Sequence, residues 1–348
     1  MIGPFDREVR LKMKSITHWA LPLLLISALA TTGFAQEPKW NSNKEYEDFS
    51  AVYKEMDYAK KAALAEKFLV DHKNADPVYL TQAFQMMILS YANGSNWLKT
   101  LETVERQNLA PKLTDADKKN YNQIGLLAAT NLKNNAETLK YADRVLTDDP
   151  NNLNALITLS NLLSQTLPAT EPAKTAALQR TLDITKRALA QPKPANVAEG
   201  QWNPIQLQLH QTTCMVLLNQ HKYPESMAEC QAALKINPKD SYAWYLIGMS
   251  LKVDLADKAA KYVKSVQNFN DVRTTANPIE LDELKATIQS MEKIAEDQRA
   301  ETLDAFAKSA AAGGPAATQA REEIQKITNN AEETNKLIEE KKGQPGNN

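Results

Sequence analysis

The stretch YPESMAECQAALKINPKDSYAWYLIGMSL, residues 223–251, decides the fold class. Apolar residues recur at three- and four-residue spacing on both sides of the Asn-Pro pair at 237–238, and this spacing predicts two amphipathic helices. Pro238 ends the first helix, because its ring removes a backbone N–H and clashes with the preceding turn. The stretch also contains Cys230, one of two cysteines in the chain of 348 residues. It is therefore either a chemical site or one turn of a scaffold.

The same order of residues recurs after another proline. Each proline is followed by large apolar residues six, nine and thirteen positions on, and by a small residue ten positions on. The two sets are Trp244, Ile247, Leu251 and Gly248 after Pro238, and Leu156, Leu159, Leu163 and Ser160 after Pro150. A recurrent spacing of this kind indicates an internal repeat. Glycine is scarce, at 10 residues, which also suits helices.

This pattern resembles the tetratricopeptide repeat, a 34-residue helix–turn–helix unit. The clearest units are 207–238 and 241 onward, preceded by units at about 118–150 and about 81–113. The resemblance implies an all-α fold, a right-handed superhelical solenoid of antiparallel helix pairs over residues 80–272. It also implies that small residues let paired helices approach closely, while large residues fill the space to the neighbouring helix.

Other segments depart from the repeat spacing. TLPATEPAKT (166–175) is interpreted as a long turn, and QPKPANVAEGQWNP (191–204) as a long loop between repeats and the best candidate for a hinge or functional loop. Residues 44–75 are expected to form an N-terminal capping helix pair. Residues 278–342 are expected to form charged C-terminal helices that pack on the solenoid or on another chain. A disordered tail is expected at 343–348.

The N-terminus has the form of a targeting segment. Four basic residues between positions 7 and 14 precede the apolar run ALPLLLISALA (20–30), and small residues follow up to Ala35. This pattern predicts a signal peptide at 1–35 cleaved after Ala35, with Met13 as a natural start. The run is too short to span a membrane. We therefore expect an exported protein, periplasmic or secreted, with no membrane span in its mature form.

The charge balance disfavours nucleic acid as a partner. Without residues 1–35 the chain has 37 basic and 40 acidic residues, a net charge of −3. The two signs alternate at helical spacing, which is typical of solvated helix faces, and no basic stripe is left. No phosphate-binding loop, dinucleotide fingerprint, zinc-protease motif or nucleophile elbow occurs at usable spacing, so no cofactor is expected.

His210, Cys214 and Cys230 are expected to converge inside one helix pair. Residues 210 and 214 lie one turn apart on one helix, and the repeat template brings residue 230 against them. Three interpretations stay open: plain core packing, a disulfide between Cys214 and Cys230 in an oxidising compartment, or a metal or thiol site. A fourth zinc ligand is missing, because His221 lies at the turn. The one-turn offset between the cysteines is near the limit for a disulfide.

In the tetratricopeptide family the first helix of each repeat lines the concave face. None of these segments contains Asp or Glu; they are 80–93, 119–131, 153–166, 207–219 and 241–253. Glycoside hydrolysis and metal-assisted chemistry, which need clustered carboxylates, are therefore not expected on this face. Its groove positions are rich in amides and continue into two tyrosines: Gln82, Gln85, Asn122, Asn154, Asn161, Gln208, Gln211, Tyr242 and Tyr245.

Amide side chains both donate and accept, so this row could hold the main chain of an extended peptide; an inert hydrophilic wall is the alternative. The lysine of the carboxylate clamp that some family members carry is absent, so chaperone docking is not expected. The sequence thus predicts a non-catalytic scaffold of the cell envelope that binds a protein or peptide in its concave groove. Structural oligomerisation through the C-terminal helices is the alternative, and a Cys/His metal or thiol site is a remote one.

Overall fold

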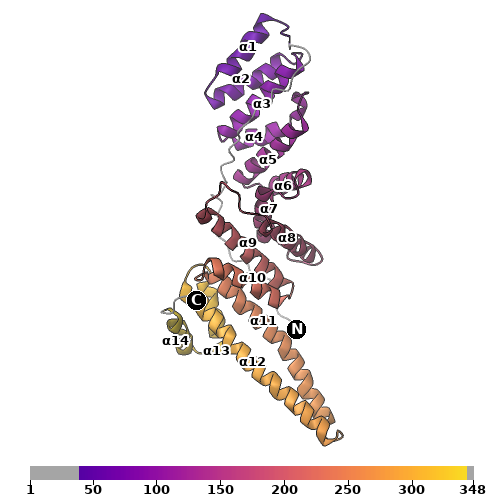
Figure 1. The fold of residues 1–348 in the computed structure, drawn as a ribbon, viewed down its shortest axis with the longest axis vertical. Helices are drawn as coiled ribbons and strands as arrows, with labels where there is room; N and C mark the ends of the chain where they lie inside the picture. Colours follow the sequence, from indigo (N-terminus) through magenta and orange to yellow (C-terminus); the bar gives the residue numbers. More distant parts are fainter. Residues whose placement is uncertain (1–38, 343–348) are drawn as a thin grey trace. The chain divides into compact units, whose positions relative to one another are not determined.

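The computed structural model describes residues 39–342, so the predicted signal peptide and the predicted tail at 343–348 lie outside the described residues. Within 39–342 the chain forms fourteen α-helices and one short 3-10 helix, with no β-strand (Figure 1). The predicted all-α class is confirmed. No helix in this part is long and apolar enough to cross a membrane. The chain divides within α7 (Leu153–Gln165) into two compact units, each described by itself.

The N-terminal unit contains six α-helices and the 3-10 helix ahead of α7. They are α1 (Asn43–Lys54), α2 (Tyr58–Asp71), α3 (Pro77–Asn93), α4 (Trp97–Val104), η1 (Gln107–Leu109), α5 (Asp115–Asn131) and α6 (Asn135–Asp148). Side-chain caps define several helix starts. Asp57 accepts from the backbone N–H of Lys60 in α2, and Thr114 and Asp117 form a reciprocal capping box at α5. These caps satisfy N–H groups that have no partner within their own helix.

The close approach of α5 and α6 depends on Gly125. A Cβ there would lie 2.5 Å from the ring of Tyr141, well inside contact distance, so only glycine admits this ring. The buried Tyr141 donates its hydroxyl proton to Glu105, which also accepts from Lys140 and Arg144 at 3.0 Å each. Burial raises the pKa of Glu105, but the hydrogen bonds from Tyr141 and Lys140 and the charge of Arg144 outweigh burial and lower it to about 2. This cluster fastens α6 to the end of α4.

The C-terminal unit follows α7. It contains α8 (Ala173–Leu189), α9 (Glu199–Asn219), α10 (Tyr223–Ile236), α11 (Ser241–Val272), α12 (Pro278–Ala312), α13 (Ala317–Thr328) and α14 (Ala331–Lys342). The long loop predicted at 191–204 is wrong in its second half, because α9 already begins at Glu199 and includes Pro204. Trp202 is buried in these first turns, and burial of its indole stabilises them. The non-helical segment is therefore 190–198.

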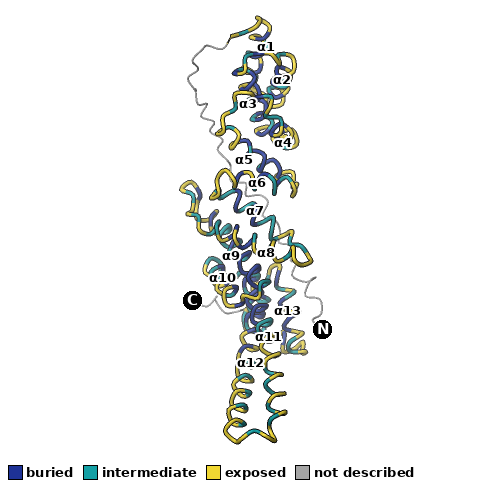
Figure 2. Tube along the Cα trace, turned by 90° about the vertical axis from the view of Figure 1, so that its right-hand side faces the viewer, coloured by how far each residue is buried: buried dark blue, intermediate teal, exposed yellow. Residues whose placement is uncertain are grey.

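The last helix pair also differs from the predicted repeat. The helix–turn–helix unit predicted from residue 241 onward requires a turn and a second helix, but α11 continues unbroken to Val272 and α12 returns along it. The ring of Phe306 on α12 covers Gly248, where a Cβ would lie 2.6 Å from it. The C-terminal half of α12 thus takes the place of the expected second helix. The outer halves of both helices, residues 254–297, project from the rest of the unit, and we call them the arm (Figures 1 and 2).

Helices α13 and α14 are held on this unit by ion pairs at two carboxylates. Glu323 accepts from Lys252 and from Lys326, and Asp304 accepts from Lys341 at 2.7 Å and Lys308 at 2.9 Å. Burial raises the pKa of each carboxyl group, but the lysine hydrogen bonds outweigh it and leave both pKa values lowered. Helices α13 and α14 therefore pack on α12 of their own chain, and α13 also contacts α11.

Candidate binding face

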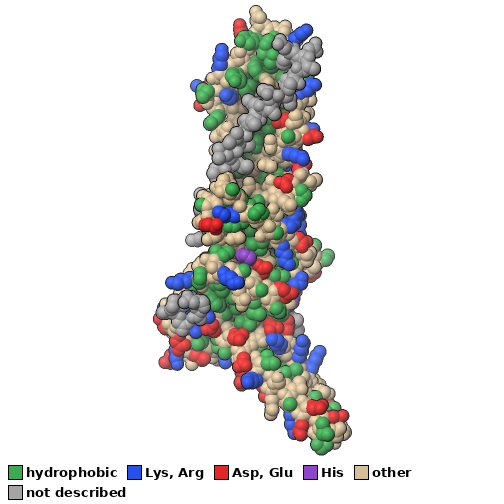
Figure 3. All heavy atoms as spheres, viewed as in Figure 1, with side chains coloured by type: hydrophobic (Ala, Val, Ile, Leu, Met, Phe, Trp, Pro, Cys, Tyr) green, Lys and Arg blue, Asp and Glu red, His purple; other side chains and the backbone are tan. Residues whose placement is uncertain are grey.

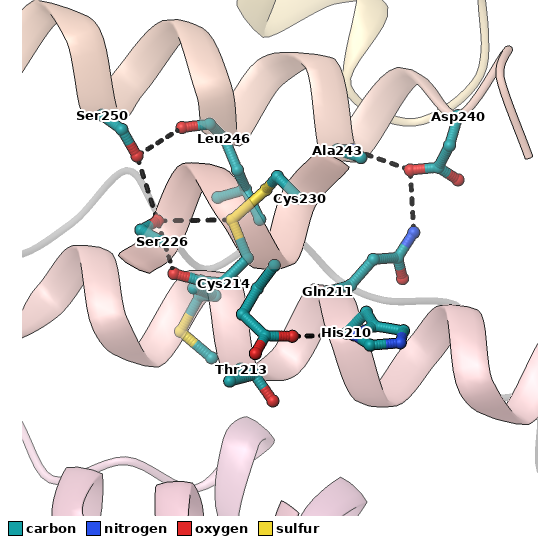
Figure 4. Close-up of a disulfide and its surroundings, with 12 residues drawn as sticks. His210, Gln211, Thr213, Cys214, Ser226, Cys230, Asp240, Ala243, Leu246 and Ser250 are labelled. Atoms are coloured by element: carbon teal, nitrogen blue, oxygen red, sulfur yellow. Dashed lines mark hydrogen bonds and ion pairs between the residues drawn. A yellow bond between two sulfur atoms is a disulfide. The ribbon is translucent and has the colours of Figure 1, made fainter. Parts of the chain in front are cut away.

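Cys214 on α9 and Cys230 on α10 form a disulfide, with their Cα atoms 5.5 Å apart (Figure 4). Both side chains are fully buried. The one-turn offset that made the bridge uncertain in the sequence lies within normal disulfide reach. Of the three interpretations for this cluster, the disulfide is the one the structure contains, and no free thiol is left.

A chain of buried hydroxyl groups lies beside the disulfide and joins three helices (Figure 4). Ser226 on α10 donates to the carbonyl oxygen of Cys214 at 2.9 Å, and its Oγ lies 3.1 Å from that of Ser250 on α11. Ser250 also donates to the carbonyl oxygen of Leu246. These buried hydroxyls are therefore satisfied, as polar groups in a core must be. The site is a packed junction between helices.

His210 does not meet the cysteines, so the prediction that the three side chains converge is wrong. Its Nδ1 lies 2.7 Å from Oε2 of Glu229, at the half-buried edge of the pair. The physical reason is that Cys230 turns inward to its disulfide, which leaves its neighbour Glu229 to meet the imidazole. Within residues 39–342, no group of three or more His, Cys, Asp or Glu side chains is placed to hold a metal ion.

Three of the predicted groove amides donate hydrogen bonds to aspartates that follow later in the chain. The bonds are Gln85 to Asp117 at 3.3 Å, Asn122 to Asp148 at 3.2 Å, and Gln211 to Asp240 at 2.8 Å. The last is drawn in Figure 4, where Asp240 also caps α11 by accepting from the N–H of Ala243 at 2.7 Å. The amides thus tie first helices to helix ends further along the chain.

These bonds change the chemistry expected of the face. The groove segments predicted from the sequence contain no Asp or Glu, yet Asp117, Asp148 and Asp240, near helix ends, bring three carboxylates to their amides. Asp117 and Asp240 lie where the sequence places helix starts, so their capping role could be predicted from position. Their second role, accepting from an amide on an earlier helix, depends on how the helices pack. A single sequence carries no signal for that pairing.

The other predicted groove residues differ in how far they are exposed to solvent. Gln82 is exposed, while Asn154, Asn161 and Gln208 are half-buried. Tyr245 is only 4% exposed, its ring centroid lies 5.8 Å from that of Phe306, and its predicted place in the groove is wrong. Tyr242 is half-buried against the same core, and burial raises its pKa. Tyr245 loses access to solvent because α12 packs on α11.

The held amides keep part of their hydrogen-bonding capacity. Asn122 and Gln211 each use one amide N–H for the aspartate, which leaves a carbonyl oxygen and a second N–H. A carboxylate that fixes the rotamer also removes conformational entropy that binding would otherwise cost. Such a pair can accept from and donate to a peptide main chain, and the carboxylate favours N–H donors and cationic side chains.

Comparison with known proteins adds nothing to this geometry: no protein-family model matches the chain, and no curated protein is detectably similar to it. Any function must therefore be argued from the side chains described above.

Proposed function

We propose that the chain is a non-catalytic, protein-binding scaffold of the cell envelope. Its first helices would hold an extended segment of a partner, in the manner of a tetratricopeptide-like solenoid of antiparallel helix pairs. The observation that carries the proposal is the set of three amide–aspartate bonds, at Gln85, Asn122 and Gln211. The same arrangement recurs on α3 and α5 of the N-terminal unit and on α9 of the C-terminal unit, and each amide–aspartate pair would dock one stretch of peptide main chain.

The partner would be an extended segment with free backbone N–H groups and at least one basic side chain. Each amide can bond one peptide group, and each neighbouring carboxylate adds a charge-assisted acceptor. A strongly acidic segment would be repelled by Asp117, Asp148 and Asp240. This requirement narrows the expectation from the sequence, in which the face had no carboxylate.

An envelope location is supported by two independent features. The N-terminal sequence has the charge and apolar pattern of a signal peptide. The Cys214–Cys230 disulfide is the kind of bond that persists in an oxidising compartment and is rare in the cytosol.

The proposal is tested by retention of envelope proteins on immobilised chain lacking residues 1–35. Wild type is compared with a double variant, Asn122→Ala and Gln211→Ala, and with a control that removes two exposed amides elsewhere, Asn135→Ala and Gln231→Ala. We expect wild type and control to retain the same partner and the double variant to lose it. If the double variant retains that partner at the wild-type level, the amide face is not the binding surface.

A further inference from the structure

The arm buries no side chain at all. Every residue from 252 to 297 is half-buried or exposed, whereas α11 is buried without interruption from residue 245 to residue 251. Figure 2 shows this change along the helices, from dark blue in the body of the unit to teal and yellow in the arm. The arm is therefore a pair of helices without a core of its own.

Two helices in this state lack the main source of helix stability, which in proteins is tertiary packing. Half-buried apolar residues recur along α12 at alternating spacings of three and four, as in a coiled-coil seam. They are Leu281, Leu284, Ile288, Met291 and Ala295. Outside this seam, Ile279 is 73% exposed and Ile294 48%. These exposed apolar side chains would be stabilised by a second apolar surface packed against the arm.

On one flank of the arm, each helix carries a row of one charged, one small and one apolar residue. Helical spacing places Lys261, Ser265 and Val272 in one row on α11, and it places Glu283, Thr287 and Ile294 in one row on α12. The central residue of each row is small. In Figure 3, acidic, basic and apolar side chains lie close together along the arm.

Contacts across the seam fix the level of these rows. Tyr262 donates to Glu292 at 2.7 Å, and Gln298 donates to Asp254 at 2.8 Å, so the two helices run in opposite directions with residue 265 near the level of residue 287. Each row then has the same layout about this midpoint. Its charged residue lies four positions before the small residue, and its apolar residue lies seven positions after it.

Opposite helix directions make this layout self-complementary. Toward the base of the arm lie Lys261 on α11, four residues from the midpoint, and Ile294 on α12, seven residues from it. Toward the tip lie Glu283 on α12, four residues from the midpoint, and Val272 on α11, seven residues from it. Turning one arm end over end about the level of Ser265 and Thr287 brings lysine to the level of glutamate and valine to that of isoleucine.

We propose that two copies of this chain dimerise through their arms, packed flank to flank in opposite directions about a two-fold axis at Ser265 and Thr287. Lys261 of each copy then pairs with Glu283 of the other, and Val272 lies against Ile294. The small residues at the axis let the helices approach closely, and the half-exposed seams become the core of a four-helix bundle. This inference does not depend on the proposed peptide-binding face.

A second copy is favoured over an unrelated helix by the free charges. Lys258 pairs with Asp254 at 2.7 Å and Lys285 with Asp282 at 3.3 Å, whereas no ion pair engages Lys261 or Glu283 within residues 39–342. A two-fold contact pairs Lys261 of each copy with Glu283 of the other, so that both of these charges gain a partner in each copy. Of residues 278–342, from which self-association was expected, this proposal uses only 278–297, and it adds residues 254–272 of α11.

The sharpest test is disulfide trapping in the full mature chain. Both native cysteines are already bonded to each other, so a new cysteine has no partner within its own chain. Ser265→Cys lies on the proposed axis, where it meets its own copy. Gln267→Cys is the matched control, because it is exposed two residues away on another face of the helix. Under mild oxidation we expect the first variant to run at twice the chain mass and the control to stay single.

Charge reversal supplies the second measurement. Lys261→Glu alone and Glu283→Lys alone each place like charges together twice per dimer, so sedimentation should show each variant as a monomer where wild type is a dimer. An equal mixture of the two variants restores both pairs and should sediment as a dimer. A control with Lys54→Glu and Lys60→Glu, both exposed and in the other unit, should behave as wild type.

Three results would each overturn the proposal: a monomeric wild type, equal cross-linking of the two cysteine variants, or a mixture of charge variants that stays monomeric.

Discussion

The α9–α10 pair and the arm are both built from two helices joined by a short turn, yet they differ in what lies between those helices. Between α9 and α10 lie a disulfide, a chain of satisfied hydroxyls and fully buried side chains on both helices. Between the two helices of the arm no residue is buried. A sequence that favours helices therefore does not show whether a helix pair is stable without a partner. The burial of the side chains between the two helices does.

The largest expected effect is the difference in stability loss between a core substitution at the base of the α11–α12 pair and a substitution in the arm. Phe306→Ala removes a fully buried ring that fits over Gly248, and we expect it to lower the free energy of unfolding by about 3–5 kcal/mol. Ile288→Ala in the half-buried seam of the arm should lower it by less than about 1 kcal/mol below the concentration at which arms pair. Urea denaturation followed by circular dichroism measures both. Equal losses would contradict the contrast.

Removal of the disulfide comes next. The bridge closes a loop with a sequence separation of 16, so replacing both cysteines by alanine should cost about 3 kcal/mol. Reduction of the wild type should lower its denaturation midpoint toward that of the variant. The variant itself is the control, since a reductant should leave its midpoint unchanged. A wild-type midpoint that is insensitive to complete reduction would show that packing alone holds α9 to α10.

Acid should weaken the packing of α13 and α14 before it affects that of α9 and α10. The pKa values of Glu323 and Asp304 are lowered in the folded state, so their stabilisation is complete above the unfolded-state values of 4.5 and 3.8. It is lost as the pH falls through the lowered folded-state values. Glu323→Gln should therefore flatten the fall in stability below about pH 4.5, whereas Glu322→Gln, its exposed neighbour, should not. Identical pH profiles for the two variants would rule out this role.

The smallest effect is expected at the amide ties. Gln211→Leu removes the bond to Asp240, which keeps its role as the cap of α11, so the loss should be about 1 kcal/mol. Gln208→Leu, which removes a half-buried amide one turn away, is the control and should change stability by less than about 0.5 kcal/mol. A loss at Gln208 as large as at Gln211 would mean that the amide row contributes through hydration rather than through its aspartate bonds.

The helices and their small contact residues could be predicted from the sequence. Proline spacing and apolar periodicity indicate most helix boundaries, although not the start of α9 or the end of α11. Gly125 and Gly248 stand where the repeat pattern asks for a small residue. The partners of those glycines could not all be predicted in the same way. Tyr141 lies on the next helix, but Phe306 lies beyond the whole arm, and no local pattern links it to Gly248.

The residue types of the candidate face could be predicted from the sequence, but their hydrogen-bond partners could not. The amides were visible as a row, but their aspartate acceptors lie 26 to 32 residues later in the chain, at separations set by helix packing. The burial of Tyr245 had the same cause, because the helix that covers it is the distant α12. The disulfide was left open because a one-turn offset alone does not determine whether two sulfur atoms meet.

Hydrogen exchange of the arm as a function of protein concentration tests the central contrast most directly. If the arm becomes a finished element only when a second arm packs against it, its backbone amides should exchange fast in dilute solution and slow down as concentration rises. Amides of α9 and α10 should be equally protected throughout. Arm amides that are as protected as those of α9 and α10 at every concentration would contradict this, because the arm would then be stable without a partner.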